Sequence, residues 1–320
     1  MPLSLGIDIG GTTMKVVLLS DSGEIHGERH VSTKAEEGPE SVTARLAELI
    51  AACKRESAEG LGAVGVTVPG VLDQAREQVL LLPNFPVAWH KVSLRSELHR
   101  LTGVKVELLN DARAAAFAEL YAGAGQGYSD FICLVLGTGV GGGIVIDREL
   151  MLGSRGVGGE LGHQVIRPGG LRCGCGNRGC LETIASGSAI ASAAIRMIRQ
   201  GLPTTMRDIV RGDVGLVTSE TVDAAAGIGD PYALEILADA ADALVQAIRN
   251  ATAMLNPEAV ILGGGVSASE RLLEMVRSRL TRETILFPAE LGGVHVVRAK
   301  FEHYAGAVGA AAWALTRMEE

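Results

Sequence analysis

Apolar residues gather into short runs along the first half of the chain, and turn-forming residues separate these runs. Short apolar runs between glycine, proline or polar positions are typical of buried strands. The strands expected in this half are 3–9, 14–21, 24–33, 62–70 and 104–110. After Pro39 the apolar residues instead recur at the spacing of one helix face. The expected helices are 39–56, 93–103 and 111–123.

The second half repeats the opening pattern and then becomes mainly helical. Residues 130–150 indicate a strand, a glycine-rich turn and a second strand, as in the opening stretch "LGIDIGGTTMKVVLL". The stretch 187–256 is expected to be mostly helical. The remaining elements expected are strands at 258–267 and 293–299 and helices at 269–280 and 306–320. The echo between the two hairpins indicates an α/β protein built from two related halves.

The length of the chain predicts more than one domain. At 320 residues it is longer than a single hydrophobic core usually supports, so two domains are expected. We expect the chain to cross between them near 111–120 and the last helix to return to the first domain. A smaller α/β domain is therefore assigned residues 1–115 with the helix 304–320. A larger α/β domain, 116–303, contains a cysteine-rich loop.

The composition argues against nucleic-acid binding and membrane insertion. The formal net charge is −8 and aromatic residues make up 3% of the chain, so neither a basic surface nor a base-stacking platform is expected. The apolar runs stay well short of about 18 residues, and no basic segment leads into an apolar one at the start, so neither a membrane span nor a signal peptide is expected. A cytoplasmic protein is therefore expected. The 42 glycines indicate many tight turns.

Three glycine-rich turns directly follow predicted strands: "DIGGTTMK" at 8–15, "LGTGVGGG" at 136–143 and "LGGGVS" at 262–267. Bare backbone N–H groups with nearby hydroxyls form the kind of donor array that phosphate prefers. Asp8, at the end of its strand, can hold Mg²⁺ through water. Each turn alone is also explained as a simple connection, but three together favour a phosphate-bearing ligand. Neither a P-loop nor a Rossmann fingerprint occurs, so a nucleotide would bind in a two-domain cleft of another type.

Asn110 and Asp111 stand where the strand 104–110 meets the helix 111–123. Either residue can be a simple N-cap of that helix. Alternatively, Asp111 is a carboxylate that accepts a proton from an attacking hydroxyl. The sequence leaves both interpretations open.

Two loops carry polar side chains of the kind that a sugar site needs. One is "GVGGELGHQ" with Glu160 and His163, and the other is "LPNFPVAWH" with Asn84 and Trp89. Either stretch on its own is equally typical of an ordinary loop.

Three cysteines and one histidine have the spacing of a metal site: His163-x9-Cys173-x-Cys175-x4-Cys180. Three thiolates and one imidazole are the ligand set of a closed, structural Zn²⁺ site. A bridge within the C-x-C pair is strained, and no C-x-x-C redox motif occurs. A disulfide between Cys175 and Cys180 is the alternative. The two other cysteines are expected to be buried bystanders: Cys53 and Cys133.

Six motifs in chain order carry a resemblance to a known family: "DIGGTTMK", "LNDARAAA", "LGTGVGGG", "ELGH", "CGCGNRGCLE" and "LGGGV". Together they resemble the ROK family of repressors, open reading frames and sugar kinases, and within it the ROK-type glucokinases. The combination of "ELGH" with CxCGxxGCxE is the specific part of the match, whereas the glycine turns alone would not identify the family. The resemblance spans nearly the whole chain, from Leu3 to the final helix.

The resemblance implies an α/β fold of the actin-like, hexokinase type. In that fold two domains of duplicated ribonuclease-H-like topology hold ATP and sugar in the cleft between them. It implies ATP-dependent phosphorylation of a hexose, glucose first, at its 6-hydroxyl. It also implies Mg²⁺ with the ATP, a structural Zn²⁺, and a homo-oligomer that is a dimer or tetramer.

The resemblance also implies a role for individual residues, with Asp111 as the catalytic base. The residues implied to bind sugar hydroxyls are Asn84, Asn110, Asp111, Glu160, His163 and Glu182. The residues implied to bind Mg²⁺, phosphates and adenosine are Asp8, Gly10, Gly11, Thr12, Thr13, Lys15, Gly137, Thr138, Gly139, Gly264 and Gly265. The implied zinc ligands are His163, Cys173, Cys175 and Cys180.

Two alternatives to a glucokinase stay open. The first is a kinase for another hexose: N-acetylmannosamine, N-acetylglucosamine, fructose, mannose or allose. Here the stretch "CLETIASGSAI" resembles the glucokinases more than the fructokinases. The second is a sugar-sensing regulator of the same family. Such regulators carry an N-terminal DNA-binding domain, for which no room is expected before the strand that begins at Leu3.

Overall fold

The chain divides into two compact units. The computed structural model describes residues 3–57, 60–83, 85–86, 89–283 and 293–317. The first unit comprises Met1–Ser129, Gly143–Gly159 and Lys300–Glu320, and the second comprises Asp130–Gly142 and Glu160–Ala299. This division places 116–129 and 143–159 in the first unit, whereas the sequence analysis assigns them to the second domain.

The first unit contains a five-stranded mixed sheet. Its order is β3 (Ile25–Ser32), β2 (Thr13–Leu19), β1 (Leu3–Ile9), β4 (Leu61–Val68) and β7 (Val106–Asn110). The strands β1, β2 and β3 are antiparallel, and β4 and β7 run parallel to β1. All five strands expected in this half are therefore present. A small antiparallel pair, β5 (Val71–Leu72) and β6 (Val79–Leu81), follows β4.

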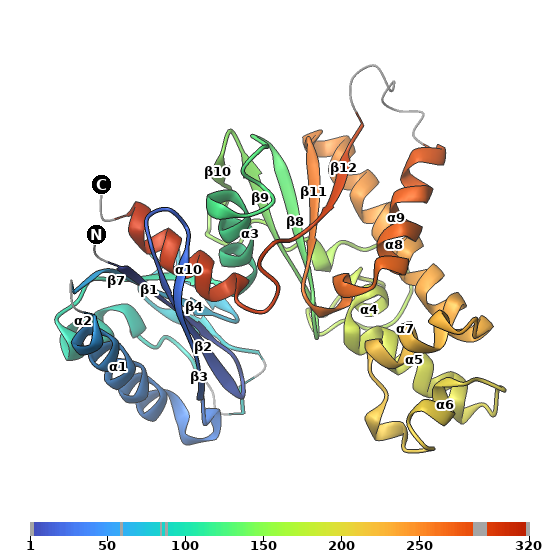
Figure 1. The fold of residues 1–320 in the computed structure, drawn as a ribbon, viewed down its shortest axis with the longest axis horizontal. Helices are drawn as coiled ribbons and strands as arrows, with labels where there is room; N and C mark the ends of the chain where they lie inside the picture. Colours follow the sequence, from blue (N-terminus) through green and yellow to red (C-terminus); the bar gives the residue numbers. More distant parts are fainter. Residues whose placement is uncertain (1–2, 58–59, 84, 87–88, 284–292, 318–320) are drawn as a thin grey trace. The chain divides into compact units, whose positions relative to one another are not determined.

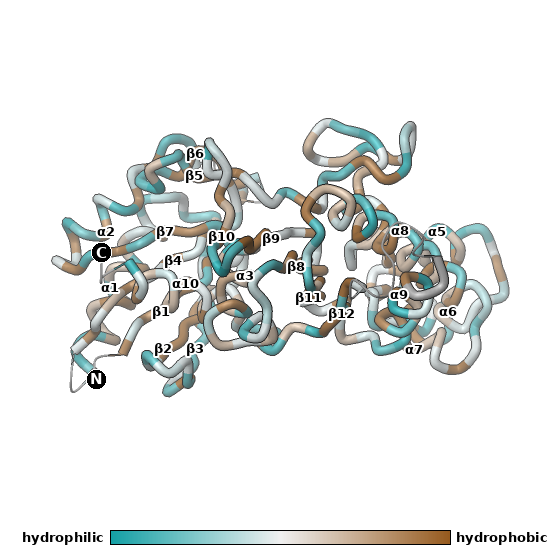
Figure 2. The backbone as a smooth tube through the Cα atoms, turned by 90° about the horizontal axis from the view of Figure 1, so that it is seen from above, coloured by the Kyte–Doolittle hydropathy of each residue, from teal (hydrophilic) through white to brown (hydrophobic). Residues whose placement is uncertain are grey.

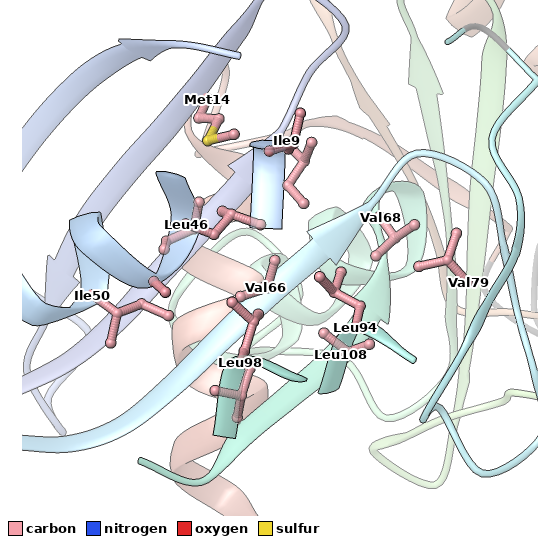
Figure 3. Close-up of a cluster of buried hydrophobic side chains, with 14 of the residues drawn as sticks. Ile9, Met14, Leu46, Ile50, Val66, Val68, Val79, Leu94, Leu98 and Leu108 are labelled. Carbon is pink, nitrogen blue, oxygen red and sulfur yellow. The ribbon is translucent and has the colours of Figure 1, made fainter. Parts of the chain in front are cut away.

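Two helices cover one face of this sheet and bury its main core. They are α1 (Gly38–Glu56) and α2 (Leu94–Thr102). Figure 3 shows how leucine and isoleucine side chains of both helices meet the strands, with Leu46 and Leu98 among those that are fully buried. The helix α2 ends at Gly103 in the left-handed conformation, φ 67°, as the sequence predicts.

The opposite face of the sheet is covered by α10 (Ala305–Thr316), which packs in turn on α3 (Asp111–Ala122) (Figure 1). Neighbouring residues of a strand point to opposite faces. Ile7 and Val66 therefore face α1 and α2, while Gly6 and Gly65 face α10. A Cβ atom on Gly6 or Gly65 would lie 1.9 Å from a carbonyl oxygen of α10, so only glycine allows this approach.

A second five-stranded sheet has the order β10 (Glu149–Leu150), β9 (Val140–Ile146), β8 (Phe131–Leu136), β11 (Ala259–Gly263) and β12 (His295–Arg298). The strands β8, β11 and β12 are parallel. The hairpin predicted over 130–150 is therefore present as β8, a turn and β9. The boundary between the two units falls within β9.

The second unit is otherwise helical, as expected for 187–256. Its α-helices are α4 (Glu182–Ala185), α5 (Gly187–Arg199), α6 (Met206–Ile209), α7 (Ser219–Gly227), α8 (Pro231–Leu255) and α9 (Glu270–Glu283). Hydrophobic stretches alternate with hydrophilic ones along these helices (Figure 2). Among the residues described, no helix has both the length and the apolar composition that a bilayer crossing requires.

Candidate functional site

The residues predicted to act on substrate fall into two groups, one in each unit. Asp8, the turn 10–13, Lys15, Asn110 and Asp111 belong to the first unit. The second unit holds Gly137, Thr138, Gly139, Glu160, His163, the cysteine cluster, Glu182, Gly264 and Gly265. The predicted sugar ligand Asn84 lies outside the described residues.

Asp8 is the last residue but one of the central strand β1, and it lies on the face that α10 covers. Thr67 on β4 donates a hydrogen bond of 2.5 Å to Asp8 Oδ1, and Lys15 is its register partner on β2. Burial raises the pKa of the Asp8 carboxyl, while the Thr67 hydrogen bond and the Lys15 charge oppose that rise. A Cβ on Gly306 would lie 2.7 Å from Asp8 Cγ, so the carboxyl packs against the first turn of α10. A partly desolvated carboxyl of this kind suits a hard cation such as Mg²⁺.

The turn after Asp8 is held through its carbonyl groups. Gly10 N donates to Thr13 O at 3.1 Å, and Thr33 N donates to Thr12 O at 2.9 Å. The Thr33 hydroxyl also donates to Gly10 O at 2.7 Å. Because the carbonyls are used inside the protein, the exposed tip at Gly11 and Thr12 presents donors, as phosphate binding requires. Sequence reasoning missed Thr33, since it stands far from the motif and has no pattern of its own.

Asn110 is the N-cap of α3, and Asp111 is its first residue. Asn110 Oδ1 accepts from the backbone N–H groups of Ala112 and Arg113 at 3.1 and 3.3 Å. Its Nδ2 donates to Gly70 O at 3.1 Å. Asp111 is half-buried, and its Oδ1 accepts from Ala112 N at 2.9 Å. The capping interpretation thus applies to Asn110, and the Asp111 carboxylate lies in the positive potential of a helix N-terminus.

Arg113 is a second residue that sequence reasoning missed. It is 3% exposed, and its guanidinium donates to Asn110 Oδ1 at 2.7 Å and to Gly158 O at 2.8 Å. It therefore joins the cap of α3 to the glycine-rich loop around 158. The only signal in the sequence is a basic residue in the first turn of a helix, where cations are otherwise disfavoured.

The predicted zinc ligands come together in the second unit. One ligand atom from each of His163, Cys173, Cys175 and Cys180 lies within 4.8 Å of the others. Cys175 Sγ lies 3.7 Å from Cys180 Sγ, and all five cysteines of the chain are free thiols. Zinc–sulfur bonds of about 2.3 Å place tetrahedral sulfur ligands about 3.8 Å apart. The spacing therefore fits a shared metal ion and not the alternative disulfide, and Cys53 and Cys133 are buried elsewhere.

Backbone hydrogen bonds fix the loop that carries these thiols. Gly179 O accepts from the N–H groups of Ile166 and Arg167 at 2.8 and 3.0 Å, and Cys173 N donates to Asn177 O at 2.8 Å. Gly179 has φ 76°, and a Cβ there would lie 1.7 Å from Arg167 O. Only glycine tolerates both the positive φ and the lack of space for a Cβ, which explains the glycine of "NRGC".

The thiols differ in how readily they ionise. Burial raises the pKa of Cys173 to about 12 and also raises the pKa of Cys180. The backbone N–H of Asn177 instead lowers the pKa of Cys175, which is exposed. A metal ion binds thiolates, so it would have to displace protons from the two buried thiols.

Glu182 links the cysteine cluster to the glycine turn after β8. Its Oε2 accepts from Val140 N at 3.0 Å, and Cys173 Sγ donates to its Oε1 at 3.4 Å. A Cβ on Gly139 would lie 2.4 Å from Glu182 Oε2. His163 directs Nδ1 to Cys173 Sγ at 3.5 Å and places Nε2 4.0 Å from Glu160 Oε2. The cluster thus includes one of the predicted sugar ligands, His163, and contacts a second, Glu182, while Glu160 lies beside it.

A pocket of about 370 Å³ opens beside the same turn. It is lined by Gly137, Thr138, Gly187, Ser188, Ala191, Val217, Thr218, Ser219, Glu220, Gly265 and Val266. Three of the predicted cofactor residues line it: Gly137, Thr138 and Gly265. Gly139 instead contacts Glu182, and Gly264 packs on the backbone of Leu136.

Two helices begin at this pocket, α5 and α7. Gly187 N donates to Gly137 O at 2.8 Å, which ties the start of α5 to the turn. Helix N-termini present donors and positive potential to anions. Sequence reasoning missed the lining residues from α5 and α7, although a small-residue run at 186–189 and a capping box at Thr218–Thr221 mark both helix starts.

Comparisons with known proteins show the family and the fold of the chain. A model of the ROK family matches residues 4–317. The glucokinase of Thermotoga maritima is 40% identical over 313 residues, covering 96% of this chain and 95% of that protein. The N-acetylmannosamine kinase of Shigella boydii is 31% identical over 308 residues, covering 96% and 97%. The crystal structure of a ROK family glucokinase from Streptomyces griseus, in complex with glucose and AMPPNP, superposes with a TM-score of 0.84 at 32% identity, covering 98% and 99%.

Proposed function

The chain belongs to the ROK family and has the actin-like α/β fold of that family's sugar kinases, and on this premise we propose that it phosphorylates the 6-hydroxyl of a hexose with ATP. Glucose is the proposed substrate, because relatives named glucokinase reach 40% identity over nearly the whole chain. The pocket beside the turn 137–139 is the observation that carries the ATP assignment. It combines a volume of about 370 Å³ with two helix N-termini, as a nucleotide requires.

Asp111 is the proposed general base. Its carboxylate accepts the proton of the 6-hydroxyl as the sugar oxygen bonds to the γ-phosphorus of ATP. The bond from that phosphorus to the bridging oxygen breaks, and ADP leaves with the electron pair. Phosphoryl transfer asks the protein mainly for positioning and charge stabilisation. The cap formed by Asn110 and Arg113 supplies this positioning at the base.

The turn 10–13 and Asp8 are proposed to serve the phosphates and Mg²⁺, with Lys15 nearby. Mg²⁺ neutralises phosphate charge when it is bound. Thr138, Gly139, Gly264 and Gly265 are the proposed partners of the nucleotide in the second unit. Asn84, Asn110, Glu160, His163 and Glu182 are the proposed hydrogen-bond partners of the sugar hydroxyls.

The cysteine cluster is proposed to hold one structural Zn²⁺. Four protein ligands leave no open position, so the ion would take no part in the chemistry. Its effect would be positional, because His163 is a ligand and Glu182 contacts the ligand Cys173. Such outer contacts orient the groups that meet the substrate.

A panel of hexoses tests the substrate assignment. With ATP and Mg²⁺, kcat/KM is expected to be highest for glucose. N-acetylmannosamine is the second candidate, since a kinase for that sugar is 31% identical over 308 residues. If kcat/KM is higher for N-acetylmannosamine than for glucose, N-acetylmannosamine is the substrate instead. An inactive panel that still binds sugar would favour a regulator instead.

A further inference from the structure

The pocket beside the turn 137–139 is lined mainly by small and hydroxyl-bearing residues. Among its described lining residues, Glu220 alone has an ionisable side chain. Nothing in the phosphate-binding role of the glycine turn accounts for a carboxylate here, because it would repel the triphosphate. Glu220 therefore marks a part of the pocket that receives a different part of the ligand.

Glu220 stands on a well-fixed helix start. Thr218 is the N-cap of α7, and the hydroxyls of Thr218 and Thr221 exchange hydrogen bonds with each other's backbone N–H at 3.4 and 3.1 Å. The Thr218 hydroxyl, followed by the Glu220 backbone N–H, lowers the pKa of the Glu220 carboxyl. The side chain is therefore a carboxylate at neutral pH and acts only as a hydrogen-bond acceptor.

The carboxylate faces the glycine turn after β11. Its Oε1 lies 3.9 Å from the position that a Cβ on Gly265 would take. Gly265 and Glu220 both line the pocket and lie next to each other there. A ligand in the pocket therefore meets the acceptor from α7 beside the bare backbone of Gly265.

We propose that Glu220 binds the ribose of the nucleotide by accepting hydrogen bonds from its 2′- and 3′-hydroxyls, and so selects ribonucleotides as phosphate donors. The proposal rests on the proposed function, in which this pocket receives ATP. The neighbouring hydroxyls of ribose are two adjacent donors, and they match the two oxygens of a carboxylate. The adenine amino group is the other donor of the nucleoside, and its two hydrogens offer no such paired match to both oxygens.

The test compares ATP with 2′-deoxy-ATP in wild type, Glu220→Ala and a matched control, Glu235→Ala, an exposed acid on α8 outside the pocket. Loss of a hydrogen bond to a charged group corresponds to about a 10- to 100-fold effect. Wild type should therefore prefer ATP by about that factor in kcat/KM. Glu220→Ala should lose the preference, because kcat/KM falls more with ATP, which loses two hydrogen bonds, than with 2′-deoxy-ATP, which loses only the bond from its 3′-hydroxyl. Glu235→Ala should keep the preference. An equal fall with both nucleotides would overturn the proposal.

Two further measurements separate the possible failures. Inosine triphosphate lacks the amino group of ATP. The ratio of kcat/KM with ATP to kcat/KM with inosine triphosphate should be the same in Glu220→Ala as in wild type. A change in that ratio alone would assign Glu220 to the base and overturn the ribose contact. Calorimetric binding of ADP and 2′-deoxy-ADP reads the same preference without turnover. Wild type that binds ADP with this preference but phosphorylates no sugar would contradict the proposed function and support the Glu220 contact. Wild type that binds neither nucleotide would overturn both.

Discussion

The two glycine turns that follow β1 and β8 have the same sequence pattern but different supports. In each, an apolar strand runs into a Gly-Thr turn and an antiparallel partner strand. The turn after β1 is held by Thr33, next to the end of β3. The turn after β8 is held by Glu182, which also contacts Cys173 of the cysteine cluster, and by Gly187 of α5. The first turn thus depends on its own sheet, and the second depends on a cysteine loop about 40 residues away.

This difference teaches that the sequence of a Gly-Thr turn carries no information about which residues hold the turn in place. The comparison predicts that a substitution in the cysteine cluster changes the turn 137–139 and the proposed sugar ligands next to it. It also predicts that a substitution at Thr33 affects only the turn 10–13. Substitutions at Asp111, Cys173 and Thr33 separate the proposed proton transfer from the support of each turn.

The largest effect is expected from Asp111→Asn, which removes the proposed base and leaves both turns intact. The amide keeps an oxygen that can accept from Ala112 N but cannot take the hydroxyl proton. We expect kcat to fall by about 10²- to 10⁴-fold. Sugar and ATP affinities should change little. Coupled ADP release and calorimetry measure the two quantities. Near-normal kcat would show that the base is another group.

The next effect is expected from Cys173→Ala, which removes one proposed zinc ligand and the thiol that contacts Glu182. The variant should lose its single zinc ion and its melting temperature should fall on the order of 10 °C. Because His163 and Glu182 lose their support, the Kd for sugar should rise as well. Metal analysis, thermal melting and sugar titration check the three outcomes.

Cys53→Ala is the matched control, because Cys53 is also buried, at 1% exposure, but lies in α1 of the first unit. It should lower the melting temperature while zinc content and sugar affinity stay as in wild type. If Cys173→Ala loses zinc yet binds sugar normally, the cluster stabilises only its own loop. The predicted difference between the supports of the two turns would then be wrong.

The parts of the site that the sequence predicts correctly are those encoded by neighbouring residues. The strands, the end of α2 at Gly103 and the His-Cys cluster all follow from local patterns. The roles of Asn110 and Asp111 could not be separated, since both residue types cap helices and only the backbone geometry decides.

The residues that the sequence does not reveal act across long separations. Thr33 supports Gly10 across 23 positions, and Arg113 reaches Gly158 across 45. Glu220 enters the pocket because α7 begins there, which depends on how the helices of the second unit pack. Such contacts are tertiary, so neither the hydrophobic periodicity of the sequence nor the spacing of its motifs predicts them.

The smallest effect is expected from Thr33→Val, which tests the support of the first turn. Valine keeps the backbone N–H bond to Thr12 O but removes the hydroxyl donor to Gly10 O. Loss of this part-buried hydrogen bond costs about 1 kcal/mol of turn ordering, which ATP binding then has to supply, so KM for ATP should rise about fivefold. Zinc content should be unchanged, because no described contact joins Thr33 to the cluster. Thr43→Val, an equally buried position in α1, is the control and should leave KM unchanged. A loss of zinc in Thr33→Val would show that the two turns share one support, which would contradict the difference proposed between them.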